Sequence, residues 1–178
     1  MLEPGCTLNY VNLKVGSLAN LHLAKSSAGV RYTYGGDTYS MSYCSLFVGT
    51  HTKTLYNGAT STLISNITNC TISPVDGSSY STCVLSFALG SSQFAFGGFV
   101  GINTANLNIA NCFIDYNIEI GTNGSASTGV RGNSVGGFVG YAGGGSSTSL
   151  KITDCMSYVA FSVTGVSSTS YAPSSSKY

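Results

Sequence analysis

The sequence predicts an all-β protein whose strands stack as a parallel β-helix-like β-solenoid of about three repeats of ~42 residues, with an N-terminal β cap. Three observations predict this fold: a pentapeptide that recurs unchanged, a second motif that recurs at a nearly constant interval, and an apolar alternation that changes phase at the same place in each copy. Repeats of this length cannot bury an apolar face alone and bury it by stacking. The fold is therefore inferred from the repeated motifs.

The repeated motif has two parts, a pentapeptide GGFVG and a downstream element that reads L-x-I-x-[ND]-C. The Asn/Asp-Cys step recurs after 42 and 43 residues, so the period survives where the spacers vary. Copy one is reduced to FVG and I-x-N-C, whereas copies two and three are complete. The motif parts lie at 47–49 and 67–70 in copy one, at 97–101 and 107–112 in copy two, and at 136–140 and 150–155 in copy three.

The glycines of the motif are expected at turns or where two backbones come close, because a residue without Cβ fits both situations. They do not form a nucleotide-binding loop, since neither GxGxxG spacing nor a following helix pattern is present. The repeat glycines are Gly49, Gly97, Gly98, Gly101, Gly136, Gly137 and Gly140.

The apolar alternation changes phase at the Asn-Cys step. In copy two, Leu107 and Ile109 share one face before the step, whereas Cys112, Ile114 and Tyr116 share a face of opposite parity after it. This pattern predicts a corner, because an uninterrupted strand would carry its apolar set into solvent. Asn and Asp suit corners because they bond nearby backbone and tolerate left-handed dihedrals. The predicted corner residues are Asn69, Cys70, Asn111, Cys112, Asp154 and Cys155.

The motif resembles the GLUG-motif repeats, whose pattern is approximately G-G-[LF]-V-G-x-N, a variable gap, and I-x-N-C followed by an aromatic residue. The segment 97–113 matches nearly throughout, including Asn103 and Phe113. The resemblance implies a secreted or surface-attached protein, such as an adhesin or the accessory region of a secreted peptidase, and a motif without catalytic residues. The chain departs from the pattern where Ser45 and Leu46 replace the glycines of copy one, and where Ala142 and Met156 replace the Asn and the aromatic of copy three.

Three regions are predicted along the chain. Residues 1–44 form a cap or extra coils, within which 17–24 is interpreted as a helix; 45–165 form the GLUG-like repeats; and 166–178 form a Ser-rich tail or linker. The dipeptide Asn57-Gly58 predicts a hairpin or loop inserted in copy one. The first ten residues lack the features of a secretory signal, so the chain is interpreted as a mature form or a fragment.

The chain carries very little charge. Only 7% of its residues are charged and its formal net charge is +1, so little long-range repulsion keeps copies apart. This favours self-association or a coat of sugar, and an extracellular or cell-surface location. The basic residues are scattered, which argues against nucleic acid, and no apolar run approaches the roughly 20 residues of a membrane span.

No metal, cofactor or catalytic site is predicted. The six cysteines are even in number, which leaves disulfides and buried free thiols as open alternatives, and the absence of a CxxC pair argues against zinc. Asp115 and Glu119 share a strand face about 13 Å apart, farther than the roughly 5–9.5 Å of paired glycosidase carboxylates. His22 and His51 are interpreted as ordinary surface groups. The protein is therefore not expected to be an enzyme.

The sequence yields three functional hypotheses. The leading hypothesis is an extracellular structural or adhesive protein that self-associates as a fibril or surface-layer component. The alternatives are a carbohydrate-binding adhesin module, with Tyr141 and Tyr158 as stacking platforms, and a non-catalytic region of a larger secreted hydrolase. Sequons of the N-x-[ST] type make three asparagines candidate glycosylation sites, namely Asn66, Asn69 and Asn123.

Overall fold

The computed structural model describes residues 1–15, 18–23, 30–34, 37–55, 57–75, 82–88, 93–123, 134–143 and 147–164. Side chains are described for 1–15, 45–55, 57–75, 95–117, 134–143 and 147–160. Every regular element within these ranges is a β-strand, and nearly all strand pairs are parallel. The all-β class is confirmed, and the parallel sheets are consistent with a parallel β-helix-like fold.

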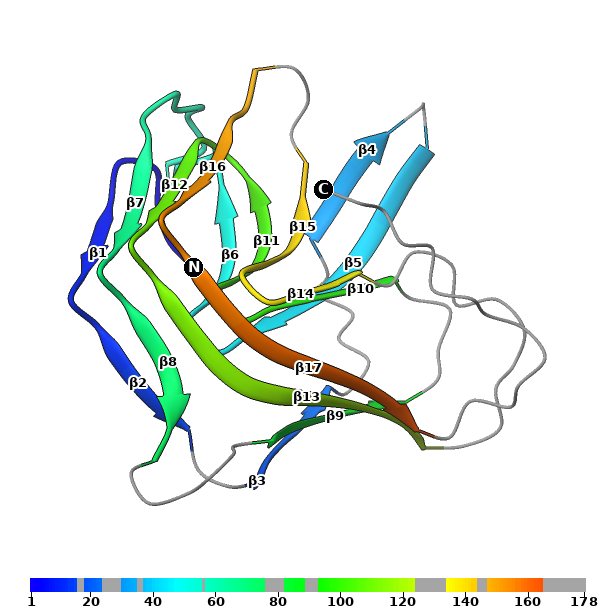
Figure 1. Cartoon of the computed structure of the whole chain (residues 1–178). Helices are drawn as coiled ribbons and strands as arrows, with labels where there is room; N and C mark the ends of the chain where they lie inside the picture. The colour runs from blue at the N-terminus through cyan, green and yellow to red at the C-terminus, as the bar shows by residue number, and fades with distance from the viewer. Residues whose placement is uncertain are drawn as a thin grey trace.

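The first sheet contains β1 and the three strands that precede the Asn-Cys or Asp-Cys steps. Its order is β1-β7-β12-β16, and Figure 1 shows these strands side by side in chain order. The motif copies pair in register, since Ile109 lies opposite Ile67 on one side and Ile152 on the other. The strands are β1 (Thr7–Asn9), β7 (Ser65–Thr68), β12 (Leu107–Ala110) and β16 (Leu150–Thr153).

The second sheet contains the strands that follow the corner. Its order is β2-β8-β13-β9-β3, and β17 pairs with the other side of β13. The long strand β13 pairs with β8 near its start and with β9 further along. The strands are β2 (Asn12–Val15), β3 (Leu18–Leu23), β8 (Thr71–Pro74), β9 (Thr82–Ala88), β13 (Phe113–Asn123) and β17 (Met156–Thr164).

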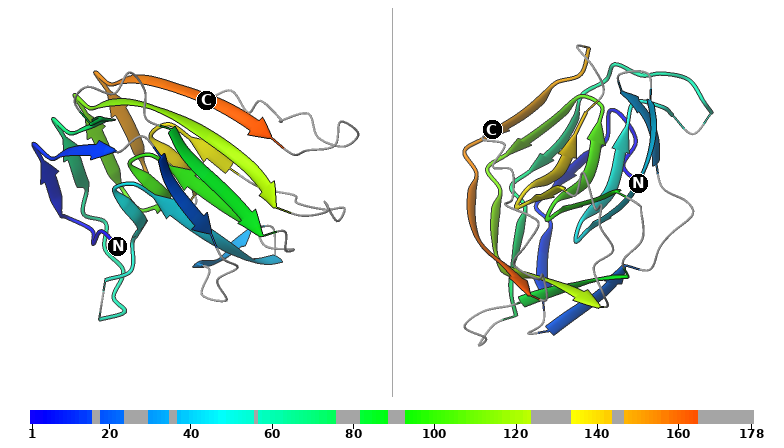
Figure 2. Two further views of the ribbon diagram at one scale, coloured as in Figure 1. Left: turned by 90° about the horizontal axis from the view of Figure 1, so that it is seen from below. Right: turned by 90° about the vertical axis from the view of Figure 1, so that its right-hand side faces the viewer.

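Two further sheets complete the stack, as the views in Figure 2 show. One has the order β15-β11-β6 and the other β14-β10-β5-β4, in which β4 runs antiparallel to β5. The strands are β4 (Val30–Tyr34), β5 (Asp37–Ser45), β6 (Val48–Thr52), β10 (Gln93–Gly97), β11 (Val100–Thr104), β14 (Ser134–Gly136) and β15 (Val139–Ala142).

The helix expected at 17–24 is wrong. Residues Leu18–Leu23 form β3, which pairs in parallel with β9 from Leu18↔Thr82 to Leu23↔Phe87. Its neighbour in the sheet decides the conformation of a short, weakly biased segment, because tertiary context overrides intrinsic helix propensity. The predicted tail at 166–178 lies outside the described residues.

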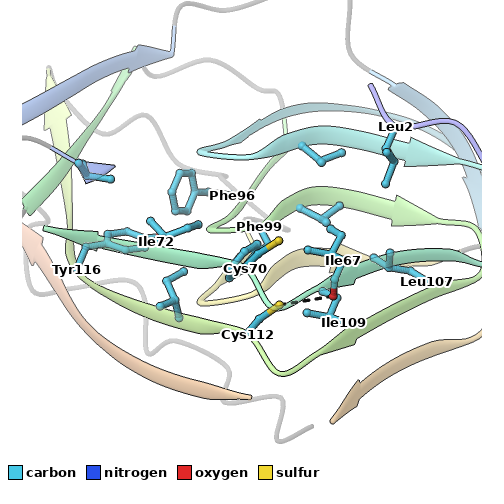
Figure 3. Packing of buried hydrophobic residues seen from close by; sticks show 14 residues of the cluster. Leu2, Ile67, Cys70, Ile72, Phe96, Phe99, Leu107, Ile109, Cys112 and Tyr116 are labelled. Atoms are coloured by element: carbon cyan, nitrogen blue, oxygen red, sulfur yellow. Dashed lines mark hydrogen bonds between the residues drawn. The ribbon is translucent and has the colours of Figure 1, made fainter. Parts of the chain in front are cut away.

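The buried side chains follow the predicted parity. Ile67 and Ile109 before the corner and Ile72 after it are fully buried (Figure 3). Ile114, also after the corner, is fully buried as well. Burying an aliphatic side chain of this size contributes roughly 1.5–3 kcal/mol. At the corner the chain bends so that the apolar side chains of both strands face the same interior.

Aromatic side chains stack beside this aliphatic core. Phe99 is completely buried, its ring lies parallel to that of Phe138 at 5.5 Å, and it meets the ring of Phe47 edge-on at 5.1 Å. The three residues occupy the Phe of FVG in the three copies. Each motif copy thus contributes one phenylalanine ring, and the three rings contact one another in a column.

The glycine pair of copy two lies where backbones meet closely. A Cβ on Gly97 would collide with the carbonyl of Val100 and the amide of Gly140, and one on Gly98 with Ile114 Cδ1 and the carbonyl of Gly137. Neither glycine has a positive φ, so close approach rather than an unusual dihedral requires them.

The insertion predicted at Asn57-Gly58 is a turn. Gly58 has φ +84°, its N–H donates to Leu55 O at 2.8 Å, and Thr54 and Thr60 form an antiparallel bridge across the loop. Within the described part of the chain, no helix of the length and apolarity that a bilayer crossing requires is present.

Candidate functional site

The predicted corners contain a column of residues in the left-handed conformation. Asn69, Asn111 and Asp154 have φ of 54°, 52° and 52°. Tyr10 has φ 57° and stands at the equivalent place in the first strand pair, because Asn9 lies opposite Thr68. This conformation is uncommon outside glycine, and asparagine and aspartate adopt it more readily than other residues. Four consecutive layers therefore bend in the same way.

The corner amides form a ladder on the surface. Asn111 Nδ2 donates to Asn69 Oδ1 at 2.6 Å, and Asn69 Nδ2 donates to Asn9 Oδ1 at 2.8 Å. Thr68 Oγ1 donates to the same Asn9 oxygen at 3.0 Å. Every donor in the ladder is directed toward the N-terminal end of the stack, and Asp154, which only accepts when ionised, stands at the opposite end.

The corner cysteines lie next to this ladder on the inner side. Cys70 and Cys112 are buried (Figure 3), Cys155 is half-buried, and all three are free thiols. Each thiol donates to the carbonyl two residues before it, at 3.1 Å in Cys70 and Cys155 and 3.3 Å in Cys112. Burial, with smaller contributions from the neighbouring thiols, raises the pKa of Cys112 to about 11. The Cys112 thiol therefore stays protonated near pH 7 and packs as a small core group.

For the described cysteines, the structure favours free thiols over disulfides. Cys6, which is exposed, and the three corner cysteines carry free thiols. The side chains of Cys44 and Cys83 lie outside the described residues. Among the described residues, no three His, Cys, Asp or Glu side chains gather closely enough to hold a metal ion.

A buried polar network links copies one and two. His51 Nδ1 lies 2.8 Å from Asn103 Oδ1, and His51 Nε2 lies 2.9 Å from Ser65 Oγ. All three residues are buried, and Ser65 Oγ also lies 3.0 Å from the carbonyl oxygen of Glu3. The interpretation of His51 as a surface group is wrong, because strand pairing places it opposite Asn103 within the stack.

The hydrogen bonds indicate that Nδ1 of His51 carries a proton. Asn103 Nδ2 donates to Ala105 O, so Asn103 presents its oxygen to the ring and Nδ1 of His51 is the donor. In the neutral ring Nε2 accepts from the Ser65 hydroxyl; in the protonated ring Nε2 donates, which frees that hydroxyl to bond Glu3 O. Burial lowers the pKa of His51 from its ordinary value of 6.5, and the Asn103 bond opposes this shift. The neutral ring is therefore the main form near pH 7.

The side chains of Ser65, His51 and Asn103 lie at the hydrogen-bonding distances that a nucleophile, a base and an orienting amide would have. Ser65 has no exposed surface, however, so no substrate reaches its hydroxyl in this conformation. In this conformation the network joins three strands and the N-terminal segment, where Leu2 N also donates to Thr50 O at 2.9 Å.

An open hollow of about 310 Å³ lies at the C-terminal end of the stack. Asn103 contributes to its wall from β11, and the other lining residues belong to the last strands or the segment between them. They are Ala142, Gly143, Thr148, Ser149 and Leu150. The hollow is adjacent to the position where copy three has Ala142 in place of Asn103 and His51.

The predicted glycosylation sites differ in their surroundings. Asn69 uses its Nδ2, the atom that would carry a glycan, in the corner ladder. Asn66 is half-buried and its Oδ1 accepts from Asn108 Nδ2 at 3.3 Å. Asn123 is the last residue of β13, and its side chain lies outside the described residues.

The remaining candidates are dispersed. Asp115 is half-buried on β13 opposite Tyr158, and the side chain of Glu119 lies outside the described residues, as does that of His22. Tyr158 is 62% exposed and meets Phe113 edge-on at 5.9 Å, whereas Tyr141 is half-buried. The two tyrosines lie on β15 and β17, in different sheets.

The remaining repeat glycines lie in equivalent strands. Gly49, Gly101 and Gly140 follow the first residue of β6, β11 and β15, and a Cβ on Gly140 would lie 2.6 Å from Phe96 O. Gly136 and Gly137 of copy three repeat the places of the first glycine pair.

The sequence did not reveal the role of Tyr10, and it led to the wrong assignment of His51 to the surface. Tyr10 is not a typical corner residue and Val11 follows it in place of cysteine, so this layer carries no I-x-N-C signal. A signal did exist for His51: aligning FVG-x-H at 47–51 with FVG-x-N at 99–103 places it opposite Asn103.

No family model, curated protein or solved structure matches this chain.

Proposed function

We propose that this chain is an extracellular β-solenoid scaffold of a fibril or surface layer, built from GLUG-like repeats that self-associate. The observation that carries the proposal is the in-register pairing of motif copies, Ile67 to Ile109 to Ile152, in a chain with 7% charged residues. A stack of this kind supplies rigidity, and strand edges that no described residue covers supply a means of association that few like charges oppose.

Sedimentation velocity over a wide range of protein concentration, followed by electron microscopy, tests the proposal. Species larger than the single chain are expected to grow with concentration and to appear as elongated particles. Because the chain carries few charges, added salt is expected to change the distribution little. A single-chain species at the highest concentration contradicts the proposal.

A second candidate, a module that binds glycans, is favoured by Tyr158, which is 62% exposed and meets the half-buried Phe113 edge-on at 5.9 Å. An exposed ring offers a flat apolar platform for a sugar face. A glycan array comparing the wild type with Tyr158→Ala tests it, and Tyr10→Ala, which removes a tyrosine that is 74% exposed, is the matched control. Binding that Tyr158→Ala abolishes and Tyr10→Ala retains supports this candidate; an empty array removes it.

A further inference from the structure

The stack ends in uncovered strands on both sides. Among the described residues, β1 pairs with β7 alone and β16 with β12 alone (Figure 1). The neighbouring sheet repeats this, with β2 paired to β8 and β17 to β13. Within each of these two sheets, the strands named here run in the same direction. In these two sheets, the strand at one end therefore has the geometry to pair with the strand at the other end of a second copy, in a head-to-tail contact that leaves a free edge for the next copy.

The hydrogen-bonding groups of the two edges have matching parity. The carbonyls of Ser149 and Thr153 accept from the N–H groups of Leu107 and Asn111. The backbone groups of odd-numbered residues in β16 therefore point toward β12, and Ile152 presents its N–H and C=O to the free edge. At the other end, Cys6 O and Tyr10 N bond β7, so the backbone groups of Thr7 and Asn9 face outward.

The column of core residues sets the register of such a contact. Leu8, Ile67, Ile109 and Ile152 lie opposite one another across the four strands. Continuing the column places Leu8 of a second copy over Ile152. In that register the N–H of Ile152 meets Thr7 O of the second copy, and the C=O of Ile152 meets Asn9 N–H. The register that aligns the core residues is therefore also the register in which the backbone groups of the two edges can form hydrogen bonds.

The side chains at the two ends are also complementary. Asp154 offers only acceptors at the C-terminal end of the amide ladder. The Nδ2 of Asn9 makes no hydrogen bond within the described residues, while its Oδ1 accepts from Asn69 and Thr68. A second copy thus brings an unused amide donor to a carboxylate, and a charge-assisted hydrogen bond of this kind is stronger than a neutral one.

The hollow at the C-terminal end of the stack lies where this contact would form. Leu2 forms a bridge with His51, which lies opposite Asn103, and Asn103 lies opposite Ala142. The register defined above therefore places the Leu2 segment of the second copy over Ala142, at the hollow.

We propose that β16 and β17 of one chain bind β1 and β2 of a second copy, with Leu8 over Ile152 and Asn9 Nδ2 donating to Asp154. This contact rests on the proposed self-association and names its interface. It is heterologous, so every bound copy exposes a further edge and the product is an open filament.

The central experiment exchanges the donor and the acceptor. Asn9→Asp keeps the oxygen that accepts from Asn69 and Thr68 but sets a carboxylate against Asp154 of the neighbouring copy. The association constant, measured by sedimentation velocity, is expected to fall about tenfold or more. The double variant Asn9→Asp with Asp154→Asn restores a donor opposite an acceptor, and asparagine suits the corner conformation. It is expected to recover most of the lost association.

A backbone variant gives a second readout. Ile152→Pro removes an N–H that faces the free edge and leaves the bonds to β12, and proline is tolerated at edge strands. It is expected to weaken association more than Ile152→Ala, which keeps the N–H. The unfolding midpoint of each dilute variant shows whether the fold is retained.

The outcomes are distinguishable. Association of the wild type that Asn9→Asp and Ile152→Pro leave unchanged overturns this interface while self-association stands. A wild type that remains a single chain at every concentration overturns both. Rescue by the double variant supports the interface, since a merely structural role for Asn9 predicts no recovery.

Discussion

Copies two and three carry the same motif in different surroundings. Leu107 and Ile109 on β12 are 1% and 0% exposed, whereas their counterparts Leu150 and Ile152 on β16 are 36% and 42% exposed. The corner dihedrals of the two copies are nevertheless equal, at 52°. The motif thus determines the path of the backbone, and burial depends on whether a strand has neighbours on one side or on both.

The largest expected difference between the copies comes from truncating the equivalent isoleucines. Ile109→Ala removes a completely buried side chain between two strands and is expected to cost about 3–4 kcal/mol of unfolding free energy. Ile152→Ala is expected to cost about 1 kcal/mol, because solvent already reaches that side chain. Urea unfolding of both variants, at a concentration where single chains prevail, measures the difference. Equal losses would contradict the dependence on covering strands.

The glycine pairs sharpen the same comparison. An added Cβ at Gly98 meets the backbone of Gly137 and the side chain of Ile114, so Gly98→Ala is expected to cost about 2–3 kcal/mol. At Gly137 the nearest atom is Ser157 Oγ at 2.7 Å, a side-chain atom on an exposed residue that can rotate away. Gly137→Ala is expected to cost less than about 1 kcal/mol. Thermal unfolding of the two variants checks the order.

The corner conformation and the amide ladder can be separated at Asn111. Asn111→Ala places a less tolerant residue at φ 52° and removes the bond to Asn69, with an expected cost of about 1–2 kcal/mol. Asn111→Gly relieves the dihedral and loses the bond, with an expected cost of about 0.5–1 kcal/mol. Chemical denaturation resolves the two. If the glycine variant is as unstable as the alanine variant, the ladder rather than the dihedral dominates.

The smallest expected effect concerns His51, which copy three lacks. Burial lowers its folded pKa below 6.5, so between that folded pKa and about pH 6.5 the unfolded chain binds a proton that the folded chain does not. The unfolding free energy is therefore expected to fall as the pH drops from 7 to 5. His51→Asn, which inserts the residue of copy two, is expected to flatten this slope. Urea unfolding at several pH values measures the difference between the two proteins, in which the shared carboxylate titrations cancel.

The corners were predictable from sequence because they rest on local signals. The parity change at Asn111 and Cys112 follows from the period-2 geometry of strands, and the structure places left-handed residues at each predicted corner. Tyr10 was missed because its conformation follows from pairing with β7 rather than from its own chemistry.

The remaining features depend on contacts between distant segments. The helical expectation at 17–24 failed because β9 supplies a strand partner that no local pattern reveals. The burial of His51 depends on Asn103 and Ser65, which lie 52 and 14 residues away. Likewise, the antiparallel pairing of β4 with β5 departs from the parallel pattern, and the motif copies gave no indication of it.

The loop between β6 and β7 has a practical consequence. Copy one contains ten more residues here than copy two, since Val48 lies opposite Val100 with an offset of 52 and Ser65 lies opposite Leu107 with an offset of 42. The flanking strands keep their pairing despite this extra length. The tip at Gly58 has open space around it, so the loop is a natural attachment point for a tag or a passenger domain, displayed at regular spacing along any assembly.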